Sequence, residues 1–223
     1  MSNSNFTKDN GQYKILKEVQ HEQQEKRLIE THVDSEKINM QNNFSDDSTL
    51  FDDSLANRGR VAIFIDGSNL FHAALQLNIE IDYARLLCRL TQSSRLLRAF
   101  FYTGIDRAND KQQGFLLWMR RHGYRVVTKD LMLLPDGSKS AKLDVEIAVD
   151  LITLAPYYDT AILVSGDGDL AYAVNAVSYQ GVRIEIVSLR TMASDSLIDV
   201  ADCFIDLELI KHDIQKDAHS TDN

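Results

Sequence analysis

Aspartates follow two apolar runs of the sequence at the points where buried strands would end. Asp66 comes directly after residues 61–65, and Asp167 and Asp169 come shortly after residues 161–164. Runs of this kind are typical of strands in a parallel sheet. The carboxyl ends of such strands lie at one edge of the sheet, where α/β proteins bind their ligands. We therefore expect these acids to lie close together.

Two further aspartates can reach the same edge. Asp144 opens a helical pattern, and Asp195 lies beyond a later strand at the start of a helix, whereas Asp150 is six residues from Asp144 and turns away. Ionised carboxylates ~5 Å apart repel by roughly 3 kcal/mol per pair at an effective dielectric of ~20. A hard divalent ion relieves this, so the pattern predicts Mg²⁺ or Mn²⁺. The alternative is that Asp169 and Asp195 only cap helices.

The elements that must position these acids alternate between strand and helix. We expect strands at residues 61–65, 96–102, 124–128, 161–164 and 182–188, and a last short strand at 203–207. We expect helices at residues 69–77, 82–90, 110–122, 143–155, 170–179 and 194–201. This alternation predicts βαβ units, and therefore an α/β fold with a central parallel sheet of about five strands flanked by helices.

Composition divides the chain into three parts. Residues 1–58 hold 16 hydrophobic residues and twelve Asn or Gln, too little apolar surface to fold alone. We expect a disordered or partly helical tail there, or an arm for a protein partner. Residues 59–210 form the predicted domain, and residues 211–223 a polar C-terminal tail.

Charge is distributed unevenly along the chain. The net charge of −9 argues against simple polycation binding to nucleic acid. Residues 85–142 nevertheless carry twelve Lys or Arg against four Asp, a balance of +8, and residues 143–223 carry four against fifteen Asp or Glu, a balance of −11. A basic stretch beside acids suits a polyanion such as RNA, although solvated helix faces explain it equally well. The expected contacts are Arg120, Arg121, Arg125, Lys139 and Lys142.

Several other classes of protein are disfavoured. No run of 18 apolar residues is present, and the first residues lack a signal-peptide pattern, so we expect neither a membrane span nor secretion. Two cysteines cannot build a disulfide framework, which favours the cytoplasm. Neither a GxGxxG motif after the first strand nor a P-loop motif occurs, so the sequence shows no glycine-rich loop that would bind the phosphates of a nucleotide.

Three blocks of the sequence resemble the signature blocks of NYN domains. They are Ile-Asp-Gly-Ser-Asn-Leu at 65–70, Lys-Leu-Asp-Val at 142–145 and Val-Ser-Gly-Asp-Gly-Asp at 164–169. The likeness is to the LabA-like branch of the PIN-like nucleases, known especially from bacteria, and it covers roughly residues 60–208. It implies a Rossmann-like PIN fold and an endoribonuclease that depends on Mg²⁺ or Mn²⁺.

The resemblance also implies roles for individual residues. Asp66, Asp144 and Asp167 match the family's acidic metal positions, with Asp169 as a fourth, while Asn69 and Ser165 match positions that support the first acid and the phosphate. The expected substrate is RNA, single-stranded by preference. Two alternatives stay open, namely a non-catalytic RNA-binding or regulatory module, and an adaptor that works through residues 1–58.

Overall fold

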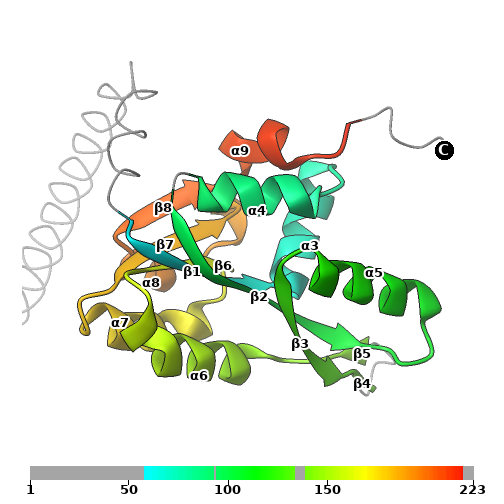
Figure 1. Cartoon of the computed structure of the whole chain (residues 1–223), viewed down its shortest axis with the longest axis horizontal. Helices are drawn as coiled ribbons and strands as arrows, with labels where there is room; N and C mark the ends of the chain where they lie inside the picture. Colours follow the sequence, from blue (N-terminus) through cyan, green and yellow to red (C-terminus); the bar gives the residue numbers. More distant parts are fainter. Residues whose placement is uncertain (1–57, 93, 134–138, 218–223) are drawn as a thin grey trace, which may run out of the picture. The chain divides into compact units, whose positions relative to one another are not determined.

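The computed structural model describes residues 58–92, 94–133 and 139–217 (Figure 1). The tail or partner arm expected at residues 1–58 lies outside the described residues except for Arg58, and so does the end of the chain from residue 218. Within the described ranges, no helix combines the length and the apolar character that crossing a membrane requires.

Six parallel strands form one sheet in the order β3-β2-β1-β6-β7-β8. Their bounds are β1 Arg60–Asp66, β2 Arg95–Ile105, β3 Tyr124–Asp130, β6 Thr160–Val164, β7 Arg183–Ser188 and β8 Cys203–Asp206. The short pair β4 Met132–Leu133 and β5 Lys139–Ser140 is antiparallel and separate. The predicted α/β fold is confirmed, with the expected last short strand as the sixth of the sheet.

Helices cover both faces of the sheet, which gives three layers (Figure 1). One face carries α3 Gly67–Leu77, α4 Tyr83–Thr91, α5 Asp110–Arg121 and α9 Leu207–Ile214. The other carries α6 Asp144–Leu154, α7 Ala171–Ser178 and α8 Asp195–Ile198. Single 3₁₀ turns occur at η1 Ala155–Tyr157, η2 Gly168–Leu170 and η3 Arg190–Met192.

The central strand β1 is buried on both faces because its side chains alternate between two cores. Val61, Ile63 and Ile65 pack on the side of α3 and α5, while Ala62 and Phe64 pack on the side of α6. This is why the strand reads as an unbroken apolar run in the sequence.

The strand order places a topological switch point between β1 and β6. From β1 the chain moves outward to β2 and β3, and it then returns to β6 and continues outward to β7 and β8 on the other side. Ile65 is in register with Val164, so the loops that follow β1 and β6 begin side by side. Ligands of open α/β sheets bind at this position.

The folded domain begins earlier than the sequence suggests. Arg58, which the composition assigned to the tail, is only 2% exposed. Its guanidinium donates to Glu185 (Nε–Oε1 2.9 Å) and to the carbonyl of Leu90 (3.0 Å). Its carbonyl accepts from the hydroxyl of Thr160 at 2.7 Å. Arg58 is therefore part of the core structure.

The domain also continues beyond residue 210, where the polar C-terminal tail was expected to begin. Helix α9 runs on to Ile214, because Ile210 and Ile214 lie one turn apart and are both buried. After it, Asp217 pairs with Arg85 of α4. Spaced apolar residues among charged ones are enough to dock this last helix.

Candidate functional site

Asp66 stands at the junction of β1 and α3. Its Oδ1 accepts hydrogen bonds from the backbone N–H groups of Ser68 (3.0 Å) and Asn69 (3.1 Å), so it is the N-cap of α3. A Cβ at Gly67 would lie 2.8 Å from the Phe101 ring, so only glycine fits this turn. The strand therefore passes directly into the helix, with Asp66 held at the carboxyl edge.

The loop after β6 is bonded to the loop after β1. The Ser165 hydroxyl donates to Oδ2 of Asp66 at 3.4 Å and accepts from the N–H of Asp167 at 3.2 Å. The side-chain carbonyl of Asn69 accepts from the N–H of Gly166 at 3.1 Å. Asn69 and Ser165 thus connect the two loops across the switch point.

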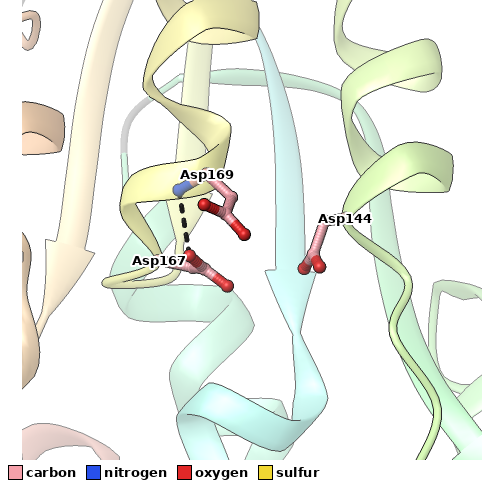
Figure 2. A group of neighbouring side chains, drawn as sticks. All are labelled: Asp144, Asp167 and Asp169. Carbon is pink, nitrogen blue, oxygen red and sulfur yellow. Dashed lines mark hydrogen bonds between the residues drawn. The ribbon is translucent and has the colours of Figure 1, made fainter.

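Asp144, Asp167 and Asp169 form an acid cluster. Each offers a carboxylate oxygen, and these three oxygens lie within 4.8 Å of one another. Figure 2 shows the three side chains directed toward a common space, Asp144 from the start of α6 and the other two from the turn after β6. Asp167 also caps η2 by accepting from the N–H of Asp169 at 2.9 Å. Asp169 is not the helix cap considered as an alternative.

Asp66 lies next to this acid cluster but is not one of its three members. Burial raises the pKa of the Asp66 carboxyl above its usual range, and the charge of Asp167 raises it further. The hydrogen bonds from the backbone N–H groups of Asn69 and Ser68 lower the pKa and offset part of this rise. Partial desolvation likewise raises the pKa of Asp144, with added repulsion from Asp167 and Asp66. The four acids therefore share one electrostatic environment.

The donor set of the acid cluster suits a hard divalent ion. All its ligand atoms are carboxylate oxygens, which Mg²⁺ and Mn²⁺ prefer. Opposite ligands of one octahedral Mg²⁺ lie roughly 4.2 Å apart, so oxygens within 4.8 Å of one another need only small rotations to share an ion. A cation would also remove the repulsion that raises the pKa of Asp144.

Two other acids considered from the sequence have partners elsewhere. Asp195, at the start of α8, pairs with Arg190 at 3.1 Å. Asp150 accepts from the hydroxyl of Tyr102 at 2.8 Å. Among the residues that the structure describes, neither joins the acid cluster.

One expected RNA contact lies beside the acids. Lys142 is exposed, and its charge lowers the pKa of Asp144, opposing the effect of the neighbouring carboxylates. The ammonium of Lys129 donates to the Lys142 carbonyl at 2.9 Å and pairs with Glu146 at 2.8 Å. Lys129 was not among the RNA contacts expected from the sequence, although the alternation of side chains along β3 puts it on the same face as Arg125.

The other expected RNA contacts are farther from the acids. Arg120 and Arg121 are exposed in the last turn of α5, which leads to the amino end of β3. Arg125 is exposed at the second position of that strand. The side chain of Lys139 lies outside the described part of the structure. The fold thus brings Lys142 to the carboxyl edge, and it leaves Arg120 and Arg121 toward the other edge.

Known proteins resemble this chain in sequence and in fold. Residues 60–208 match the NYN domain family. The low amplitude and bright protein LabA of Synechococcus elongatus is 34% identical over 165 residues, which cover 70% of this chain and 88% of that protein. A crystal structure of a protein of unknown function from Vibrio parahaemolyticus has a TM-score of 0.63 and 28% identity, and the match covers 72% of this chain and 98% of that one. The chain belongs to the NYN domain family and is a LabA-like member of it.

Proposed function

We propose that this protein is a metal-dependent endoribonuclease that cleaves single-stranded RNA. The observation that carries the proposal is the convergence of Asp144, Asp167 and Asp169 at the switch point of a PIN-like sheet. NYN domains are generally nucleases, and acids at this edge of the fold are where a phosphodiester would meet a cation. Lys142 beside them offers a positive charge to a neighbouring phosphate.

Each acid has a part in this scheme. Asp144, Asp167 and Asp169 would hold Mg²⁺ or Mn²⁺, and Asp66 adds negative charge next to them. A divalent ion bound there makes water a stronger nucleophile at neutral pH and offsets the charge of the scissile phosphate. Hydrolysis would form a bond from the water oxygen to the phosphorus and break the bond to the 3′ oxygen, which would leave as a hydroxyl after taking up a proton in place of the one that the water releases to solvent.

Asn69 and Ser165 keep the acids in position. They join the turn that carries Asp167 to the turn that carries Asp66. Groups that orient the ligands of a metal typically change its affinity or the activity by about 10- to 100-fold when removed. Their role is therefore to hold carboxylates, and they need no contact with the RNA.

A reducing cytoplasm suits this proposal. Cys88 and Cys203 are both free, and RNA substrates are found in that compartment. No described element depends on an oxidised cysteine pair.

Cleavage of a mixed RNA pool by the purified full chain tests the function. We expect products with Mn²⁺ or Mg²⁺, none in EDTA, and none with Asp167→Asn under any condition. Asn retains the cap of η2, so the variant should fold. Equal cleavage by the variant would mean a contaminating nuclease.

A different result would favour the non-catalytic alternative. If the wild-type chain binds RNA but never cleaves it with either ion, an RNA-binding or regulatory module becomes the better description. Absence of both binding and cleavage would remove RNA as the substrate altogether.

A further inference from the structure

An exposed aromatic side chain stands one helical turn after Asp169 of the acid cluster, and packing does not account for it. Tyr172, in the first turn of α7, is 85% exposed. The buried residues of this helix are Ala173, Val174 and Val177, on the opposite side. Among the described residues no hydrogen bond, ion pair or ring contact involves the Tyr172 side chain. Packing does not explain a tyrosine at this position.

The position of Tyr172 follows from that of Asp169. The two residues are three apart on a continuous η2–α7 segment, and residues at this spacing are neighbours on a helix surface. Across the acid cluster, Val145 follows Asp144 at the start of α6 and is 70% exposed. Figure 1 shows α6 and α7 side by side on the same face of the sheet. The exposed tyrosine is therefore one helical turn from an acid of the cluster, on the solvent side of α7.

We propose that Tyr172 stacks on a base of single-stranded RNA, next to the phosphate that the acid cluster receives. The inference extends the proposed function by naming a residue that selects unpaired RNA. The acids repel the phosphates of RNA wherever no cation lies between them. A side chain near the acids is therefore expected to contact the uncharged base of a nucleotide. Aromatic rings bind bases of any sequence, because every base has a π-face.

A second tyrosine, the C-cap residue of the same helix, provides a matched control. Tyr179 lies two turns further on, about 10.5 Å along the axis, and it is 83% exposed. It shares the exposure and the helix side of Tyr172 and differs in its distance from Asp169. A contact that depends on the acid cluster should involve Tyr172 and spare Tyr179.

The experiment measures binding of a fluorescent 12-nucleotide RNA by anisotropy, in the Asp167→Asn background so that no cleavage occurs. We expect Tyr172→Ala to weaken single-strand binding about 5- to 100-fold. Tyr172→Phe should bind like the parent, because stacking needs the ring and not the hydroxyl. Tyr179→Ala should also bind like the parent. The same sequence as a perfect duplex, whose bases are not available, should show no effect of Tyr172→Ala.

Each other result overturns the inference. If Tyr172→Ala binds the single strand normally, stacking is absent, and the proposed nuclease still stands on its cleavage assay. Equal weakening of single strand and duplex would mean a contact with the backbone. If Tyr172→Ala and Tyr179→Ala instead convert a dimer to monomers in sedimentation velocity, the face joins two copies of the chain. Failure of the wild-type chain to bind any RNA removes both proposals.

Discussion

Asp66 uses its two carboxylate oxygens for different purposes. One accepts from the first turn of α3, and the other accepts from Ser165 on the neighbouring loop. Although the carboxylate is well bonded, burial and the charge of Asp167 still raise its pKa. Repulsion among the acids thus destabilises the folded state, and it decreases when one acid is neutralised.

Replacing Asp144 by Asn should raise the melting temperature of the metal-free protein at neutral pH and reduce the rise that Mn²⁺ produces. The folded-state pKa of Asp144 is raised, so its contribution to stability is full below the unfolded pKa and is lost as pH rises through the folded pKa. Solvent screens this half-exposed group, so we expect a gain of no more than about 1 kcal/mol, or about 2–4 °C.

Calorimetry in EDTA at pH 4.5 and at pH 7.5 checks this, because the difference between variant and wild type should grow with pH. Asp195→Asn is the control, an exposed acid with its own arginine partner. Equal shifts for both variants, or no dependence on pH, would mean that Asp144 is not electrostatically strained.

The acids were predictable from the sequence because each follows a recognisable strand or opens a helix. The direction of each side chain was not, since it depends on bonds made across the switch point. Asp169 looked like a helix cap, yet Asp167 takes that role. Lys129 was overlooked because its importance comes from the carbonyl of Lys142, which is distant in sequence.

At the scale of elements, strands and helices matched their expected positions to within a few residues. Asp82 caps α4, and Gly123 after α5 has a positive φ of +93°, both of which are local features that residue type favours. Strand β2 extends to Ile105 because residues 103–105 pair with β3, a contact that local pattern does not reveal. The β4–β5 pair was missed because strands of two residues show no periodicity.

The arrangement of α5, β3 and α6 allows the expected RNA contacts to be ranked. Lys142→Gln should weaken RNA binding several-fold and reduce the slope of log affinity against log salt by about 1, because one phosphate contact near the acids is lost. The double change Arg120→Gln and Arg121→Gln should have a smaller effect, since α5 ends toward the opposite edge. Filter binding at several ionic strengths measures both slopes.

The opposite ranking would change the proposed path of the RNA. If the arginine pair carries the larger loss, the strand runs along α5, as the charge of residues 85–142 first suggested. If neither variant alters the slope, these side chains are solvated surface and make no phosphate contact.

At the scale of the whole molecule, the order of the strands could not be read from the sequence. Alternating elements predict a parallel sheet, but which crossovers pack on which face depends on contacts between distant side chains. The contacts that Arg58 makes with the core could not be read from the sequence for a similar reason. Arg58 stands in a polar stretch, and only its distant partner Glu185 makes it part of the fold.

Arg58→Ala should destabilise the domain by about 3 kcal/mol, because removal of one partner leaves a buried charge on Glu185. Arg183 still donates to Glu185 at 2.9 Å and limits the loss. Urea unfolding of the full chain measures the effect. Arg60→Ala, which breaks the exposed pair with Asp159, should change little.

The same reasoning applies to shortened chains. A fragment that starts at residue 52 keeps Arg58 and should unfold cooperatively like the full chain, whereas one that starts at residue 59 should be weaker. Equal stability of the two fragments would mean that the buried pair contributes little.

The pairing of β1 with β6 has a consequence for synthesis of the protein. Ile65 and Val164 are partners about a hundred residues apart in the chain, so their pairing needs most of the domain to have been synthesised. While the chain is being translated, Asp66 has left the ribosome long before Asp167 and Asp169 exist. A growing chain therefore cannot complete the acid cluster before Asp167 and Asp169 have been made. For the proposed nuclease, the place of β6 in the sequence delays activity until most of the protein has been made.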